Sequence, residues 1–274
     1  MNIKEIKAKN IITKSNLPNT DYVINPYLGC SHKCLYCYAC FMKRFSNHSE
    51  SWGDFVDIKI NAPDLIPSNT DKYKGKPIFL SSVTDPYLHF EKKYELTRNI
   101  LKKLIPLQPK LGIQSKSALL SRDIDLFKQF KEIEVGMSIS SLNDNIRKEI
   151  EPFTSSVKEK LDCLKKLKEA GLKTYVFIGP ILPEITDWKK IIEATSEYVD
   201  FYYLENLNIK GSIWQAVYSW LLDYHPDLIP LYEEIYSKGN NYWDLMESEI
   251  KSFSKANIID VKICFHHTKR YINT

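Results

Sequence analysis

Short apolar runs alternate with longer amphipathic runs through most of the 274-residue chain. The short runs have the length of buried strands, and the runs that follow them show the apolar spacing of three and four that is typical of helices. The expected strands span residues 22–25, 77–82, 111–114, 134–139, 174–178 and 201–204. The expected helices span residues 96–105, 124–130, 143–150, 156–170 and 188–198. Six βα units with short links predict a parallel sheet, either open or closed into part of a barrel.

The helix expected at residues 156–170 has the clearest pattern. Ser155 or Ser156 can cap its N-terminus. Gly171 follows it, where a left-handed C-cap would lie. Its apolar residues recur at helical spacing and form one face: Val157, Leu161, Leu164 and Leu167.

The composition and the periodicity of the sequence change after about Asn206. Residues 212–224 and parts of 232–253 are rich in aromatic residues and helical in period. We therefore expect three parts along the chain. These are an N-terminal segment at 1–20, a barrel at 21–205, and a helical C-terminal extension at 206–274 that packs on the barrel or closes its mouth.

Composition and charge narrow the class of protein. Apolar residues make up 43% of the chain and the formal net charge is +4, which allows an anionic partner without requiring one. A dedicated nucleic-acid-binding protein usually has a denser basic stripe. The N-terminus lacks the apolar segment of a secretory signal, and no run approaches the ~18 apolar residues of a membrane span. We therefore expect a cytoplasmic protein with no membrane partner.

Four of the six cysteines lie between Cys30 and Cys40, a crowding that favours a metal or cluster site in a reducing compartment over a disulfide framework. The first three have the spacing C-x3-C-x2-C. Three thiolates in such a loop can bind three irons of a cubane cluster and leave the fourth iron open for a chelating ligand.

Cys40 extends this run to C-x3-C-x2-C-x2-C, and four cysteines could instead form a closed zinc site. Structural zinc sites usually take paired ligands from two separated turns. In ferredoxin-type runs, the last cysteine does not bind the same cluster. We therefore favour a three-cysteine cluster and interpret Cys40 as a packing or bystander thiol.

The motif Cys30-x3-Cys34-x2-Cys37, with Tyr36 beside the last cysteine, resembles the signature of the radical S-adenosylmethionine (SAM) superfamily. Further stretches, in the same order, are similar to the spore photoproduct lyase-like branch, also described as DNA repair photolyase-like. They cover roughly residues 20–205 and comprise 25–39, 81–101, 113–126, 138–144, Glu151-Pro152 and 178–187.

The resemblance implies a partial (β/α)6 barrel and a [4Fe–4S] cluster bound by Cys30, Cys34 and Cys37. It also implies that SAM chelates the open iron. An external one-electron reductant would supply the electron that cleaves SAM to methionine and a 5′-deoxyadenosyl radical, which then abstracts hydrogen from the substrate. The chain would thus be a radical SAM enzyme, with the lyase or transferase class undetermined. The resemblance leaves undecided whether the substrate is a nucleic acid, a peptide or a small molecule.

In parallel α/β folds, functional sites lie at the carboxyl ends of the strands. Polar residues follow the expected strands here, and they would gather at one rim: the cysteine loop, Thr84, Asp85, Lys116, Ser138, Ser140 and Glu205.

The resemblance assigns roles to several of these residues. The positions that match SAM contacts in the photoproduct lyase are Thr84, Lys116, Ser138 and Ser140. Lys116 could pair with the methionine carboxylate. Catalytic candidates are Tyr36 and Tyr38, for radical relay or for packing near SAM, and Asp85. Glu205 is a candidate for the substrate site.

One departure from the lyase bears on the reaction. The lyase has a hydrogen-donor cysteine three residues before the aspartate that aligns with Asp85, and Ser82 occupies that position here. A serine O–H bond is too strong to donate a hydrogen atom readily, so the sequence argues against lyase activity on a thymine dimer. Cys264 could be a donor or a structural residue.

Two other interpretations of the sequence compete with that of a radical SAM enzyme. In the first, zinc or a cluster stabilises a nucleic-acid-binding protein without catalysis, and Tyr, Trp and Lys side chains form its binding face. In the second, the cluster only transfers electrons.

Overall fold

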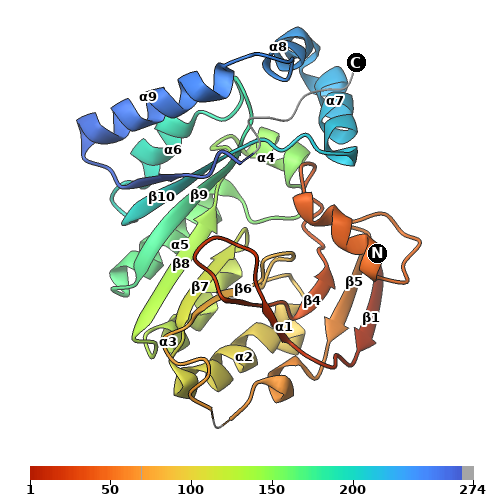
Figure 1. Cartoon of the computed structure of the whole chain (residues 1–274), viewed down its shortest axis with the longest axis vertical. Coiled ribbons are helices and arrows are strands. Elements are labelled where there is room, and N and C mark those ends of the chain that lie inside the picture. Colours follow the sequence, from red (N-terminus) through yellow and green to blue (C-terminus); the bar gives the residue numbers. More distant parts are fainter. Residues whose placement is uncertain (69, 267–274) are drawn as a thin grey trace.

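The largest element of the computed structural model, which describes residues 1–68 and 70–266, is an eight-stranded sheet of order β11-β10-β9-β8-β7-β6-β3-β2 (Figure 1). Six of these strands run parallel in chain order. They are β3 (Tyr22–Ile24), β6 (Pro77–Leu80), β7 (Lys110–Ser115), β8 (Glu132–Ser138), β9 (Lys173–Ile181) and β10 (Phe201–Asn206). These are the six strands expected from the sequence, and the α/β fold with a parallel sheet is confirmed.

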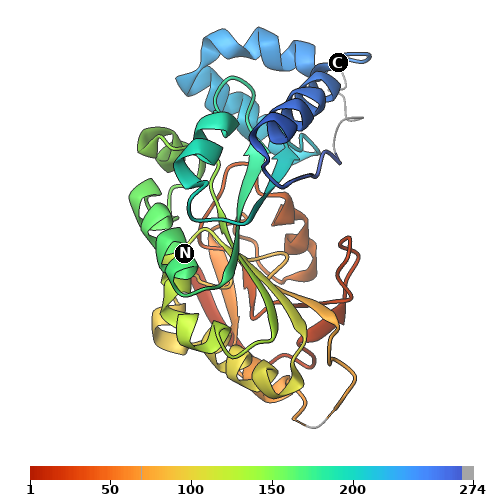
Figure 2. The same ribbon diagram turned by 90° about the vertical axis from the view of Figure 1, so that its left-hand side faces the viewer.

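Helices between successive strands cover the outer face of this sheet (Figure 2). They are α1 (Glu91–Tyr94), α2 (Leu96–Leu104), η3 (Ile105–Leu107), η4 (Ala118–Asp123), α3 (Ile124–Phe127), α4 (Asp144–Ile150), α5 (Val157–Glu169) and α6 (Trp188–Thr195). Outer-face side chains such as Leu80, Ile113 and Met137 are fully buried beneath them. The core therefore lies between the sheet and the helices, which leaves the inner face and the strand ends for a site.

Helix α5 confirms the local prediction from sequence. The hydroxyl of Ser156 accepts from the backbone of Glu159, whose carboxylate accepts in return from the Ser156 N–H, so a capping box fixes the start of the helix. Gly171 has a φ of +77°, as expected for a left-handed C-cap. The apolar face differs in one position. Lys160 is buried, whereas Leu161 is only half-buried.

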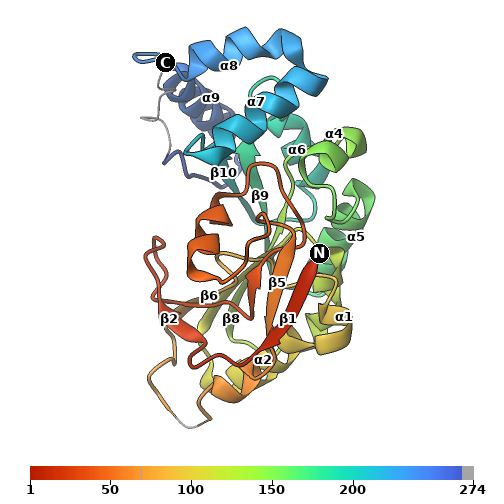
Figure 3. The same cartoon turned by 90° about the vertical axis from the view of Figure 1, so that its right-hand side faces the viewer.

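The connection from β3 to β6 carries a second, smaller sheet instead of a long helix (Figure 3). It passes through β4 (Tyr27–Gly29), the cysteine loop, η1 (Tyr38–Phe45), β5 (Phe55–Lys59) and η2 (Ala62–Leu65). Strand β5 pairs with β4 and, in parallel, with β1 (Asn2–Ile6), while β2 (Ile12–Lys14) pairs with β3. The N-terminal residues are thus tied into both sheets, through strands too short for periodicity to predict.

The C-terminal part is helical, as expected, and then returns to the large sheet. Its helices are α7 (Ser212–Tyr224), η5 (Pro226–Leu228), α8 (Ile229–Ile235) and α9 (Tyr242–Asn257). Strand β11 (Val261–Ile263) then pairs in parallel with β10 and forms the edge of the barrel. The expected division near residue 206 therefore assigns β11 to the extension, although this strand belongs to the large sheet. Across residues 1–68 and 70–266, no helix combines the length and the apolar character needed to cross a membrane.

Candidate active site

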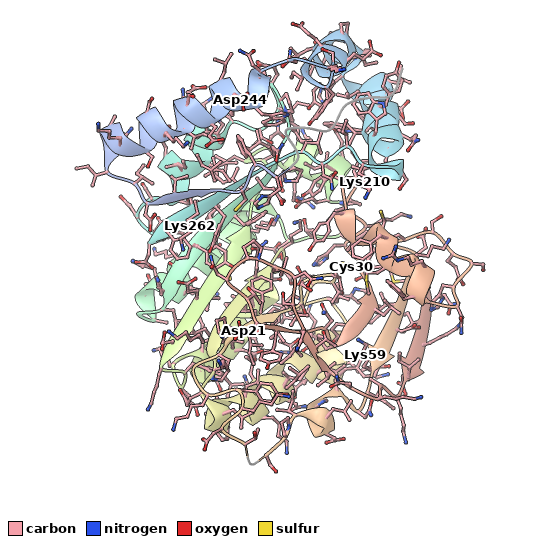
Figure 4. All side chains as sticks on the ribbon, in the orientation of Figure 1. Asp21, Cys30, Lys59, Lys210, Asp244 and Lys262 are labelled. Atoms are coloured by element: carbon pink, nitrogen blue, oxygen red, sulfur yellow. The ribbon has the colours of Figure 1, made fainter. Side chains whose placement is uncertain are left out.

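The three cysteines of the motif lie on the loop that follows β4. Gly29, directly before Cys30, has a φ of +90°, and a Cβ at this position would lie 2.3 Å from the backbone oxygen of Phe55. Only glycine lets the chain turn this close to β5. Cys30 is buried, Cys34 and Cys37 are half-buried, and all six cysteines of the chain are free thiols. Figure 4 shows Cys30 inside the molecule, near the ribbon of η1.

The surroundings of these thiols suit an iron–sulfur cluster. The indole N–H of Trp52 donates to Cys37 Sγ at 3.2 Å, and such bonds to sulfur tune cluster potentials. Burial raises the pKa of the Cys30 thiol to about 12 and also raises the pKa of Cys34 and Cys37, so all three thiols need a cation beside them to ionise. A coordinated metal ion deprotonates a thiol outright.

The same thiols do not form a site for one ion. No three His, Cys, Asp or Glu side chains within residues 1–68 and 70–266 are placed to share a single metal. A cubane cluster binds each of three thiolates to a different iron, so its ligands do not have to meet at one point. Three thiols on one loop are thus the donor set that a cubane cluster takes.

Glu151 is the centre of a buried polar network beside the loop. Its carboxylate accepts hydrogen bonds from Tyr36, from Ser140 at 3.1 Å and from Lys160 at 2.9 Å. Burial raises the pKa of this carboxyl, but Lys160 and Lys116 lower it more, and the resulting pKa is about 2. Glu151 is therefore ionised at neutral pH and holds side chains from four separate segments together.

Lys116 lies where β7 ends and faces the cysteines. Its ammonium donates to Ser138 Oγ at 2.9 Å and lies 3.9 Å from the Glu151 carboxylate. Burial lowers the pKa of Lys116, but Glu151, Cys34 and other anionic groups raise it more, so the side chain stays charged. Lys116 therefore carries a positive charge beside Cys34, and the charges of both Glu151 and Asp85 act on it.

The two tyrosines beside Cys37 have different environments. Tyr36 is buried, and its hydroxyl donates to Glu151 and lies 3.1 Å from Ser140 Oγ. Burial and the Glu151 charge raise its pKa well above the usual range. Tyr38 is 47% exposed, and its hydroxyl donates to the carbonyl of Ser82. A role in radical relay stays a prediction for both residues.

Asp85 and Thr84 are engaged with the backbone around the site. Asp85 is buried and accepts from Ser115 Oγ at 2.7 Å and from the Lys116 N–H at 2.8 Å. The imidazole Nε2 of His32, inside the cysteine motif, lies 3.2 Å from Asp85 Oδ2, the oxygen that accepts from Lys116. Burial raises the pKa of Asp85, but His32 and the hydrogen bonds lower it more. Thr84 donates to the carbonyl of Gly29 at 2.8 Å. These contacts position the loops, and a catalytic role for Asp85 stays a prediction.

Three further residues lie at the same rim. Cys40 Sγ is 3.8 Å from the hydroxyl of Ser212, the first residue of α7. Glu205 is half-buried at the end of β10, where burial raises its pKa to about 7 and Lys116 lowers it slightly. Burial and, to a lesser extent, the Glu205 charge raise the pKa of Cys264, which lies just beyond β11. The rim therefore continues from the cysteine loop to the last strand.

Comparison with known proteins identifies the family. The family model of the radical SAM superfamily matches residues 24–194, which include the cysteine loop and the strands from β6 to β9. The chain belongs to the radical SAM superfamily. It is also 42% identical over 264 residues to an uncharacterized protein of Methanocaldococcus jannaschii, covering 96% of this chain and 98% of that protein. Superfamily members are enzymes that use SAM and a [4Fe–4S] cluster.

Solved radical SAM structures share the fold. Spore photoproduct lyase complexed with dinucleoside spore photoproduct matches with a TM-score of 0.67 at 15% identity, covering 96% of this chain and 82% of that chain. Streptococcus suis SuiB bound to the precursor peptide SuiA matches with a TM-score of 0.56 at 14% identity, covering 89% of this chain and 48% of that chain. A radical SAM Nalpha-GlyT isomerase of Pseudomonas phage M6 is 24% identical over 71% of this chain and 40% of its own length. The expected partial barrel of the lyase branch is confirmed as a fold.

Several residues of the site carry no signal in the sequence. Trp52 lies 15 residues beyond Cys37, outside the cysteine motif, and Lys160 occupies an apolar helix face. Glu151 is part of a stretch that resembles the lyase branch, but its pattern alone does not reveal a buried carboxylate with partners from four segments.

Proposed function

We propose that this radical SAM enzyme binds its cluster through Cys30, Cys34 and Cys37 and removes a hydrogen atom from an organic substrate. The observation that carries this proposal is the single loop that holds three free, largely buried thiols against the Lys116 ammonium and the Trp52 N–H. An external one-electron reductant is required. The oxygen-sensitive cluster and the free thiols support a reducing, cytoplasmic location.

When bound, a [4Fe–4S] cluster with SAM on its open iron supplies the one-electron cleavage of SAM and the radical that removes hydrogen. Lys116 is the residue we assign to the SAM carboxylate, because its buried ammonium stays charged where β7 ends, beside the cysteines. Ser138 accepts from Lys116 and keeps its own O–H available for a bond to SAM. Ser140 and Thr84 donate to protein carbonyls or carboxylate, so we assign them to positioning the site.

The reaction class and substrate stay open within this proposal. The solved relatives act on a dinucleoside photoproduct in one case and on a precursor peptide in the other. Both classes, and a small molecule, are compatible with a half-exposed rim. Ser82 argues against photoproduct lyase chemistry, because a hydroxyl stands where the lyase has its donor thiol. The Ser82 hydroxyl accepts from Asn25 Nδ2 at 3.5 Å.

The test is anaerobic. The protein is reconstituted with iron and sulfide, reduced with dithionite and mixed with SAM, and 5′-deoxyadenosine is measured by mass spectrometry. We expect its formation in the wild type and its loss in Cys30→Ala, Cys34→Ala and Cys37→Ala. A colourless protein that binds about one zinc per chain and forms no 5′-deoxyadenosine would overturn the proposal and favour the nucleic-acid-binding alternative.

A further inference from the structure

The two faces of the large sheet differ in burial. On the outer face, Ile78, Val176 and Leu204 are at most 1% exposed because helices cover them. On the inner face, Tyr175 and Phe201 are buried at 2% and 1% exposed. Other residues of this face are only half-buried: Phe79, Gln114, Phe177, Tyr203 and Lys262. In closed (β/α)8 barrels, layers of branched side chains fill this space. Here the inner face is partly open to a ligand.

Glycines on neighbouring strands make room for aromatic rings on this face. Gly112 pairs with Phe79, and Gly136 pairs with Tyr175. A Cβ at Gly112 would lie 2.9 Å from the Phe79 ring, and a Cβ at Gly136 would lie 2.2 Å from the Tyr175 ring. The rings therefore lie over bare backbone of the adjacent strand, an arrangement that also stabilises glycine in sheets. The Tyr175 and Phe201 rings therefore fill part of the face, and the half-buried rings of Phe177 and Tyr203 line the rest of its aromatic surface.

One transverse row of this face connects the proposed SAM site with the edge of the barrel. The strand registers pair Ser138 with Phe177, Phe177 with Tyr203, and Tyr203 with Lys262. Lys116 donates to Ser138 at the first end of the row. Strands lie about 4.8 Å apart, so three strand spacings separate Ser138 from Lys262 by roughly 14 Å.

At the far end of this row, Lys262 makes no ion pair with a carboxylate of residues 1–68 or 70–266. Its ammonium lies 3.9 Å from the ring centroid of Phe201 and 5.0 Å from that of Tyr203, and it is 3.4 Å from the Tyr203 hydroxyl. Figure 4 shows Lys262 near the β10–β11 edge of the sheet. Lys173, which also lies over Phe201, instead pairs with Glu134 at 2.7 Å. Lys262 therefore has charge available for an anionic ligand.

We propose that Phe177, Tyr203 and Lys262 form the substrate-binding surface of this enzyme. A planar apolar group of the substrate lies on the two rings, and an anionic substituent, carboxylate or phosphate, binds the Lys262 ammonium. This inference rests on the proposed function. It adds a length requirement, because the anionic group sits roughly 14 Å from the SAM end of the row.

The test measures binding and not turnover. Equilibrium dialysis of the anaerobic holoenzyme with benzoate, phenyl phosphate and the neutral control benzyl alcohol compares the wild type with Lys262→Gln, Lys262→Arg and Lys173→Gln. Circular dichroism and cluster absorbance check that each variant folds and carries its cluster. We expect Lys262→Gln to lose about tenfold in affinity for at least one of the anions, which is about 1.4 kcal/mol, with no change for benzyl alcohol.

The remaining variants make the result specific. Lys262→Arg should retain anion binding, and Lys173→Gln should match the wild type. If Lys262→Gln loses affinity only for benzoate, the natural ligand group is a carboxylate; if it loses affinity only for phenyl phosphate, the group is a phosphate. No binding of either anion to the wild type, or equal losses in Lys262→Gln and Lys173→Gln, would overturn the inference. Neither result depends on SAM cleavage, so failure of the proposed function is recognised separately, by the absence of 5′-deoxyadenosine.

Discussion

Lys160 Nζ donates to Glu151 Oε2 at 2.9 Å, and these side chains are only 2% and 1% exposed. The pair connects helix α5, on the outside of the barrel, with a carboxylate that also accepts from Tyr36 beside the cysteines. Burying two charges is costly unless they are paired and hydrogen-bonded, and here both conditions hold. The helix core and the site are therefore coupled through one ion pair.

Replacing Lys160 with Met should destabilise the protein strongly. The substitution leaves Glu151 with only the more distant Lys116 as a counter-ion, and breaking a buried pair costs about 3–5 kcal/mol in the free energy of unfolding. Anaerobic urea denaturation followed by circular dichroism measures the loss. The matched control is Lys158→Met on the same helix, because Lys158 is 84% exposed and its pair with Asp162 should contribute less than about 1 kcal/mol.

The companion variant Glu151→Gln, combined with Lys160→Met, separates charge from packing. If the uncompensated carboxylate causes the loss, the double variant should recover part of the stability lost in Lys160→Met. An equal or larger loss in the double variant would show that packing, and not the buried charge, dominates.

Most elements that the sequence predicted have enough residues to show a period. Helix α5 has four apolar positions and a capping box, and the central strands from β6 to β10 have apolar outer faces. Strands β3, β4 and β11 contain three residues each, and of these only β3, before the cysteine loop, was expected. The three-cysteine spacing is local, so the sequence alone could predict the cluster ligands.

The remainder of the site depends on contacts between distant segments. The Glu151 carboxylate gathers Tyr36, Ser140 and Lys160 from a loop, a strand end and a helix, and no spacing rule relates these positions. Lys160 would be assigned to solvent on charge alone. Its burial follows from a partner that only the folded chain brings close.

Trp52→Phe should lower the reduction potential of the proposed cluster. The variant keeps an aromatic ring but removes the N–H that donates to Cys37 Sγ, and fewer hydrogen bonds to sulfur favour the oxidised cluster. A difference of about 1 kcal/mol between the two oxidation states corresponds to about 40 mV for one electron. A redox titration followed by electron paramagnetic resonance measures it. Trp214→Phe on α7 is the control, and an equal shift there would contradict the assignment.

Glu205→Gln should change how stability depends on pH. Burial raises the pKa of Glu205 from 4.5 to about 7, so the folded chain holds this proton where the unfolded chain has released it. The contribution of the protonated Glu205 carboxyl to the free energy of unfolding is fully present below pH 4.5. It is lost as the pH rises through about 7. Anaerobic melting curves between pH 5 and 8 should show a smaller decline for Glu205→Gln than for the wild type. Parallel curves would show that Glu205 titrates normally.

Cys40→Ala should leave the iron content unchanged at about four per chain, whereas Cys34→Ala should lose the cluster. Cys40 Sγ lies 3.8 Å from the Ser212 hydroxyl of α7, and its thiol is half-buried. Iron and sulfide analysis after anaerobic reconstitution measures both variants, with Cys163→Ala on helix α5 as a thiol control remote from the loop. A large iron loss in Cys40→Ala alone would make Cys40 a ligand and would reassign the fourth coordination position that SAM is proposed to occupy.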